Sequence, residues 1–218
     1  AGVPNVPGGS ITEVARLGLF RFLTAAALAT RQPQLLNLPP TPGVPVPFNL
    51  NFNENMPLRD LPLVVNNVPG ATAIAQVLDR FEWVQQSGNP VSYASFIRQS
   101  PLPGHAPKPV IVQFAKGDVT VPNPSSSAIL RAGALQDRAT YFRNDLAFAA
   151  SPSIPKNPHT FLNNLGIPAA VPYAIAAQQQ IAAFFKSNGI LTIDPDGPGA
   201  IFEVPIALPL PENLNFLP

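Results

Sequence analysis

The chain has 218 residues, which is enough for one hydrophobic core and a second small lobe. Hydrophobic residues make up 46% of the chain and charged residues only 11%, well below the charged share of about 25% in average soluble domains. The net charge is +1 without a basic cluster, which argues against nucleic acid as a partner.

The absence of cysteine excludes disulfides, thiolate metal sites and a cysteine nucleophile. Because there are only two histidines, a His-rich metal site is also excluded, and we expect neither a metal nor a cofactor. Pro, Arg or Asn interrupts every apolar run before it reaches about 18 residues, so no transmembrane segment is expected. The opening AGVPNVPGGS has no basic start and no long apolar core, so it is interpreted as a cut end and not as an intact signal peptide.

The first third of the chain predicts one helix followed by a proline-rich excursion. Residues 12–30 have mixed helical spacing of apolar residues, with Thr12 as a candidate N-cap. Residues 32–62 contain too many prolines for a long helix or a central strand. We interpret them as extended and docked, not disordered, because they carry the apolar anchors Leu35, Leu36, Phe48, Leu50, Phe52 and Leu58.

Residues 71–86 predict a cleaner amphipathic helix. Its apolar face consists of Ile74, Val77, Leu78, Phe81 and Val84. Together with the helix predicted at 12–30, it indicates a helical lobe.

From residue 107 the pattern changes to alternating strands and helices. Residues 108–115 (KPVIVQFA) are typical of a strand buried on both faces of a parallel sheet. A helix over 125–135, a strand over 138–148 and a helix over 172–189 follow, and this order predicts an α/β fold. The tail from Ile190 is proline-rich and is expected to run extended along the surface.

Two residues with acid–base chemistry follow the two predicted strands. Asp118 lies in GDVTVP, directly after the first strand, and His159 lies in the long loop after the second. Functional groups of open parallel sheets gather beyond the carboxyl ends of the strands. We therefore expect Asp118 and His159 to lie within hydrogen-bond reach. The alternative is that Asp118 caps the next helix and His159 is an ordinary loop histidine.

At these residues the sequence resembles the C-terminal part of an α/β-hydrolase. That family has an Asp in a context like G-x-x-D-x-x-V-P after its seventh strand, and a His in the loop after the eighth. Asp118 and His159 match these two positions, and residues 172–188 resemble the last helix of the fold. The resemblance covers residues 107–189 well and the remainder loosely.

The resemblance implies a Ser-His-Asp triad in which His159 carries the proton and Asp118 orients the imidazole. His105 has no comparable strand frame, and no catalytic role is expected for it. The family's nucleophile serine lies in a G-x-S-x-G elbow, and no such pentapeptide occurs in the chain. The nearest approach is GGSIT around Ser10, where Thr12 replaces the second Gly.

Two interpretations of Ser10 remain open. Either Ser10 is a variant nucleophile, or the segment around it is the sixth strand of a hydrolase sheet, with the serine upstream of Ala1. We favour the second. It divides the chain into a core strand (1–11), a cap or lid insertion (12–106), the C-terminal part of the core (107–189) and an extended tail (190–218). Its expected partner is the N-terminal part of the same hydrolase.

The expected function is that of a carboxylic ester hydrolase, resembling secreted bacterial esterases and lipases. A cap rich in Leu and Phe, with Trp83, favours an apolar ester substrate and interfacial contact with lipid or polymer. A secreted or periplasmic location follows from the same resemblance. The alternatives are a non-catalytic α/β binding or scaffold module, and a hydrolase-fold enzyme with another reaction, such as a peptidase or an acyltransferase.

Overall fold

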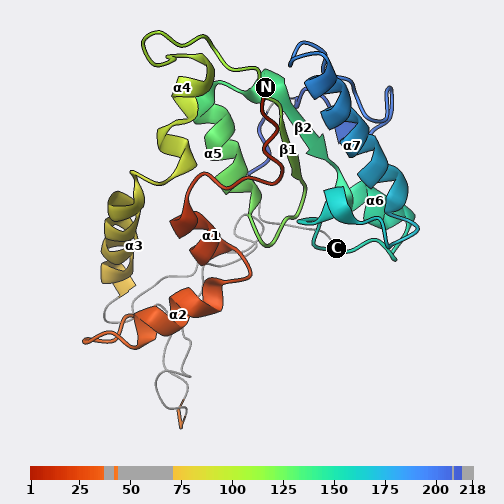
Figure 1. Cartoon of the computed structure of the whole chain (residues 1–218). Coiled ribbons are helices and arrows are strands. Elements are labelled where there is room, and N and C mark those ends of the chain that lie inside the picture. Colours follow the sequence, from red (N-terminus) through yellow and green to blue (C-terminus); the bar gives the residue numbers. More distant parts are fainter. Residues whose placement is uncertain (37–41, 44–70, 208, 213–218) are drawn as a thin grey trace.

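The computed structural model describes residues 1–36, 42–43, 71–207 and 209–212. These residues form an α/β arrangement of helices around a small mixed sheet (Figure 1). The α-helices are α1 (Ile11–Leu17), α2 (Arg21–Ala29), α3 (Ala71–Gln85), α4 (Ala94–Arg98), α5 (Asn123–Gly133), α6 (Asn144–Ala150) and α7 (Val171–Lys186). The strands are β1 (Val112–Ala115), β2 (Ala139–Phe142) and β3 (Phe202–Glu203), and the short 3-10 helices are η1 (Pro90–Ser92), η2 (Gln136–Arg138) and η3 (Phe161–Asn163).

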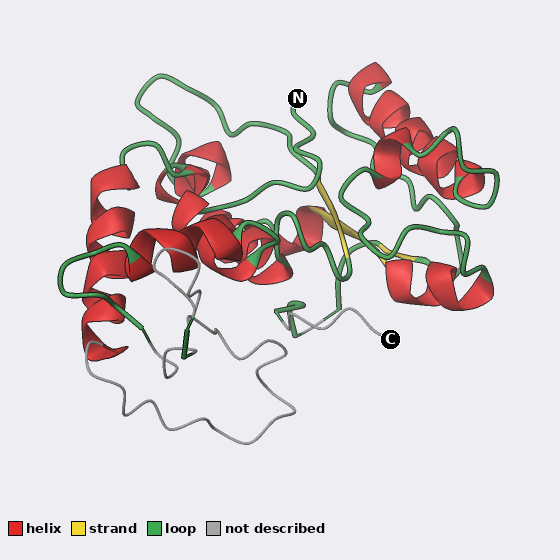
Figure 2. Ribbon diagram, turned by 90° about the horizontal axis from the view of Figure 1, so that it is seen from below, coloured by secondary structure: helices red, strands yellow, loops and turns green. Residues whose placement is uncertain are grey.

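The sheet has the order β1-β2-β3, with β1 parallel to β2 and β3 antiparallel to β2. Every residue of β1 is buried, as the apolar run at 108–115 predicted, and every residue of β2 is buried as well. Helix α5 covers one face, where Phe114 and Tyr141 contact Leu130. Helix α7 covers the other face, where Ala115 and Phe142 contact Ala177 (Figure 2). The parallel α/β arrangement predicted for this part of the chain is therefore confirmed.

The N-terminal segment runs parallel to β1 on the side away from β2 (Figure 1). Gly2 pairs with Val110, and Asn5 pairs with Gln113. The expected sheet strand at 1–11 is thus present only as two isolated bridges. Pro4 has no N–H for the ladder, and the segment leaves the extended conformation at Val6, whose φ is 45°.

The helix predicted over 12–30 is wrong as a single element. It is divided into α1 and α2 at Gly18, where the backbone becomes extended. A Cβ at Gly18 would lie 2.8 Å from the carbonyl oxygen of Thr120, so only glycine lets this corner approach the loop after β1. The N-cap is also not Thr12 but Ser10, whose hydroxyl accepts the Glu13 N–H at 3.3 Å.

Helix α3 agrees with the predicted helix over 71–86, but its apolar face is only partly buried. Within the helical lobe, Leu28 and Leu35 contact the α3 side chains of Ile74, Val77 and Leu78. The large hydrophobic side chains of α3 that are exposed are Phe81, Trp83 and Val84. Leu35 and Leu36 are buried as expected, whereas Phe48, Leu50, Phe52 and Leu58 lie outside the described residues.

The strand predicted over 138–148 ends at Phe142, and α6 begins at Asn144. The last backbone bond from this strand to the tail is donated by the Arg143 N–H to Ile201 O, one residue beyond the Phe142–Phe202 pair. The Arg143 guanidinium also binds Asp145 and Glu203, so it joins α6 to β3. The change from strand to helix therefore coincides with this ionic junction.

The tail does not simply run along the surface, as its composition suggested. Phe202 in β3 is 2% exposed and stacks on Phe142 with 5.2 Å between ring centroids. Ile206 is buried in the cluster beneath α5. The tail therefore supplies core side chains to both faces of the sheet. Within the described ranges, no helix is long and apolar enough to cross a membrane.

Candidate active site

The loop after β1 is closed by an asparagine of α5. The side-chain oxygen of Asn123 accepts the Gly117 N–H at 3.1 Å, and its amide donates to Ala115 O at 2.7 Å. Gly117 takes a φ of 79°, a conformation that favours glycine. The chain therefore turns sharply at the end of the buried strand, and Asp118 follows at the carboxyl edge of the sheet.

The Asp118 side chain is almost completely buried, with 2% of it exposed. Its Oδ1 accepts the N–H groups of Thr120 and Val121, both at 2.8 Å. Its Oδ2 lies 2.9 Å from Nδ1 of His159. Asp118 is not a helix cap, because the N-cap position of α5 is Pro122. The expected contact between Asp118 and His159 is therefore present.

His159 lies in the loop between α6 and η3 with 30% of its side chain exposed. An ionised carboxylate can only accept, so Nδ1 donates to Asp118 and the neutral ring carries its free lone pair on Nε2. Nε2 has no hydrogen-bond partner in the part of the chain that the structure describes. The imidazole is thus held at one nitrogen and open at the other, which is the arrangement a general base requires.

Burial raises the pKa of the Asp118 carboxyl, because the charged form loses its hydration. The hydrogen bonds from His159, Val121 and Thr120 lower this pKa, but burial has the larger effect. The ionised carboxylate consequently depends on these three donors.

The loop that carries His159 is also held by asparagine side chains. The buried amide of Asn144, at the start of α6, donates to Pro155 O at 3.0 Å and to Lys156 O at 3.2 Å. Asn157 lies two residues before His159 and contacts the Asp118 loop. The sequence pattern did not indicate a role for Asn144 or Asn157. The one feature of the sequence that could have indicated it was an asparagine near each strand-end turn.

Ser10 and His105 do not join the pair. The Ser10 hydroxyl donates to the Glu82 carboxylate of α3 and caps α1, so it is engaged on the helical lobe. His105 is exposed, and its backbone N–H bonds to Leu102 O.

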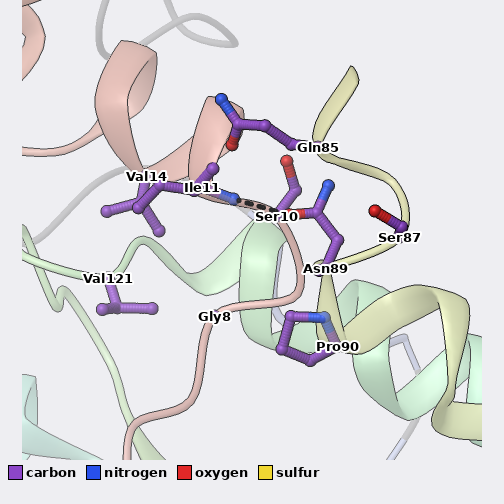
Figure 3. A pocket seen from close by; sticks show the side chains of 10 residues that line it. Gly8, Ser10, Ile11, Val14, Gln85, Ser87, Asn89, Pro90 and Val121 are labelled. Carbon is purple, nitrogen blue, oxygen red and sulfur yellow. Dashed lines mark hydrogen bonds between the residues drawn. The ribbon is translucent and has the colours of Figure 1, made fainter. Parts of the chain in front are cut away.

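A cavity of about 510 Å³ lies between the Ser10 turn and the end of α3, and Val121 of the Asp118 loop forms part of its wall (Figure 3). Here the Asn89 side-chain oxygen accepts the Ile11 N–H at 3.4 Å. The Asn89 amide donates to Glu82 at 2.8 Å. The Asn89 side chain on the cavity wall is therefore already paired, whereas the Gln85 side-chain oxygen has no hydrogen-bond partner among the described residues.

No group of three or more His, Cys, Asp or Glu side chains that could hold a metal ion occurs among the described residues. Comparisons with protein-family models, with curated proteins and with solved structures found no match to this chain. Any assignment of function therefore depends on the geometry of the site.

Proposed function

We propose that the chain is part of a serine hydrolase acting on carboxylic esters, and that it supplies the acid and base of a Ser-His-Asp triad. The observation that carries the proposal is the 2.9 Å contact between Asp118 and His159. A buried carboxylate on one strand-end loop holds a partly exposed imidazole on the next, and the second ring nitrogen has no hydrogen-bond partner among the described residues. This is the geometry by which an imidazole activates a hydroxyl nucleophile.

In the proposed reaction, Nε2 of His159 accepts the proton of a serine hydroxyl as the oxygen attacks the ester carbonyl. The Nδ1–H stays bonded to Asp118, whose negative charge stabilises the imidazolium. The same proton then passes from Nε2 to the leaving alcohol. Asp118 keeps the imidazole in the required tautomer throughout.

The proposed nucleophile is a serine of the N-terminal part of the same hydrolase, upstream of Ala1. Two observations support this. The 218 residues contain no G-x-S-x-G sequence, and the Ser10 hydroxyl is engaged by Glu82.

The order of the parallel segments supports an α/β-hydrolase sheet. Residues 1–6, β1 and β2 lie side by side in that order and run in one direction. They correspond to the sixth, seventh and eighth strands that the resemblance implies, and residues 12–106 then contribute the cap. The antiparallel β3 is an addition to that pattern.

The proposed substrate is an apolar ester, met at a lipid or polymer surface by a secreted or periplasmic enzyme. Support comes from the helical lobe, whose exposed apolar side chains include Phe20, Phe22, Leu23, Phe81 and Trp83. Residues of this kind gathered on one lobe are suited to an apolar surface.

Substitutions of Asp118 and His159 in the natural full-length polypeptide that contains these residues test the proposal. Asp118→Asn should lower ester turnover by up to about 10⁴-fold, the scale seen when a triad carboxylate is lost. His159→Ala should be at least as damaging, because it removes the base itself. Turnover of p-nitrophenyl esters of increasing chain length measures both effects, and His105→Ala is the matched control that should change little. Equal turnover in wild type and His159→Ala would refute the triad.

A serine-directed phosphonate distinguishes the alternatives. We expect label on a serine outside the 218 residues, and loss of labelling in His159→Ala. Label on Ser10 would move the nucleophile into this chain while leaving Asp118 and His159 in their roles. No label at all would favour a non-catalytic binding or scaffold module, and label without ester turnover would favour a peptidase or an acyltransferase.

A further inference from the structure

We infer that Asn157 is a positioning residue that sets the distance and orientation of the Asp118–His159 pair. The inference rests on the proposed function, because Asn157 can position the Asp118–His159 pair for catalysis only if that pair takes part in the reaction. Asn157 itself is half-buried and lies two residues before His159 in the same loop.

The side chain of Asn157 bonds to both strand-end loops at once. Its Oδ1 accepts the Val119 N–H and the His159 N–H, each at 3.3 Å. Its Nδ2 donates to the Thr120 hydroxyl at 3.0 Å. One amide therefore joins the backbone of the base to the two residues that follow the acid.

These bonds are the principal link between the two loops. Among the described residues, the hydrogen bonds between the loop at 116–122 and the loop at 155–160 are those of Asn157 and the Asp118–His159 contact itself. Without Asn157, that contact would be the one remaining hydrogen bond between the two loops among the described residues.

Thr120 links the Asn157 side-chain amide to the Asp118 carboxylate. Its N–H donates to Asp118 Oδ1 at 2.8 Å, while its hydroxyl accepts from Asn157. Asn157 thus acts on the acid through Thr120 and on the base through the His159 N–H. Because it touches both partners only through the backbone and Thr120, it positions the pair and takes no part in proton transfer.

A neutral amide suits this place better than a carboxylate. In the Asn157→Asp variant, the carboxylate oxygens would accept the same two N–H groups, and the Thr120 hydroxyl can donate to a carboxylate. The variant would therefore keep the geometry but bring a second negative charge near His159, in addition to Asp118. The variant therefore separates the effect of geometry from the effect of charge.

The test uses ¹⁵N-histidine-labelled chain, in which only His105 and His159 give imidazole signals. In wild type, we expect His159 to show the Nδ1–H tautomer with a slowly exchanging, hydrogen-bonded proton, and exposed His105 to show neither. Asn157→Ala should remove the slow Nδ1–H signal of His159 and leave His105 unchanged. In the complete enzyme, the same variant should lower kcat by about 10²-fold, the scale of a 1 Å misplacement, with little change in KM.

Two variants make the test specific. Asn157→Asp should keep the Nδ1–H signal of His159, because its carboxylate oxygens accept the same two N–H groups. Asn164→Ala is the matched control, because it removes another half-buried amide beyond His159, one whose side chain bonds only to Thr160 among the described residues. It should change neither signal nor kcat. Should Asn157→Ala fail to fold, Thr120→Val removes the acceptor of Nδ2 and should weaken the Nδ1–H signal.

Failure of the inference is distinguishable from failure of the proposed function. Suppose wild type shows the Asp118-bound imidazole and loses it in Asp118→Asn, but Asn157→Ala and Thr120→Val leave it unchanged. The positioning role is then overturned and the proposed triad stands. If wild type itself lacks the Nδ1–H tautomer, the acid–base pair fails and the inference falls with it.

Discussion

At Asp118, burial and hydrogen bonding act on the carboxyl pKa in opposite directions, and burial has the larger effect. The folded protein consequently holds this proton more tightly than the unfolded chain does. The contribution of the group to stability is complete below its unfolded pKa and is lost as pH rises through the higher folded pKa. A carboxylate kept buried at neutral pH therefore reduces stability, which is consistent with a site selected for chemistry.

Replacing Asp118 with Asn should remove this pH dependence. Asn lacks the ionisation but keeps an oxygen for the N–H groups of Thr120 and Val121. We expect the free energy of unfolding of wild type, relative to Asp118→Asn, to fall as pH rises from acid to neutral. Urea unfolding of both proteins at a series of pH values measures this.

Asp137 provides the control for that experiment, because its contribution to stability should change with pH in the opposite direction. The hydrogen bond from Arg98 lowers the pKa of Asp137, so its contribution is present above the unfolded pKa and is lost as pH falls. Wild type should gain stability relative to Asp137→Asn as pH rises, by no more than about 1 kcal/mol because the pair is exposed. A parallel pH trend for the two variants would contradict the account of Asp118.

At the scale of elements, a buried polar network specifies how the strands and α7 align. Gln113 of β1 donates to Gln180 of α7 at 2.8 Å and accepts from Asn5 at 3.0 Å. Gln180 also accepts from Thr140 of β2 and donates to Ile193 O in the tail. A one-residue shift of any partner would leave a buried amide unpaired at a cost of about 1–3 kcal/mol, so the network favours a single register.

The corner between α1 and α2 gives a prediction at the same scale. In Gly18→Ala the new Cβ would meet Val14 O at 2.7 Å and Thr120 O at 2.8 Å, and both are backbone atoms. Either the corner or the Asp118 loop must shift, at a cost of about 1–3 kcal/mol, as for other overpacked sites. Urea unfolding measures the loss.

Gly166→Ala is the matched control, because nothing lies within 4 Å of its added Cβ. It should change stability by no more than about 0.5 kcal/mol. If the two glycine variants are equally stable, the close approach at Gly18 does not constrain the loop.

At the scale of the whole molecule, residues 1–6 form an edge of the sheet with which no other described strand pairs. The N–H of Gly2 and Val6 and the carbonyls of Gly2 and Pro4 bond to β1. Alternation along an extended segment turns the N–H and C=O groups of Val3 and Asn5 the other way. Among the described residues, these groups make no backbone hydrogen bond. An edge of this kind accepts another strand, which we propose is the preceding strand of the same hydrolase.

Without that strand, the chain should associate with itself as its concentration rises. Val3→Pro removes an outward N–H from each copy. It should weaken association by roughly tenfold or more, since each such bond contributes about 1 kcal/mol. Analytical ultracentrifugation measures the effect, and Val3→Ala, which keeps the N–H, serves as the control. A wild-type chain that stays monomeric at high concentration would exclude the edge as a binding surface.

The sequence by itself determined the elements whose signals are local. The Val- and Ile-rich run at 108–115 and the helix at 172–189, with its proline and glycine ends, needed no knowledge of neighbours. The closeness of Asp118 and His159 also followed, because the carboxyl ends of adjacent parallel strands meet at one edge.

Tertiary structure alone decided the features that depend on contacts between distant segments. Gly18 divides the first helix because Thr120 approaches it, and β2 ends where Arg143 meets the tail. Phe202 enters the core because the tail pairs with β2 as the antiparallel strand β3. Asn157 holds both loops because its amide faces residues nearly forty positions earlier. A local sequence pattern cannot identify such partners, because the hydrogen bonds and burial of a residue depend on distant segments that contact it only in the folded chain.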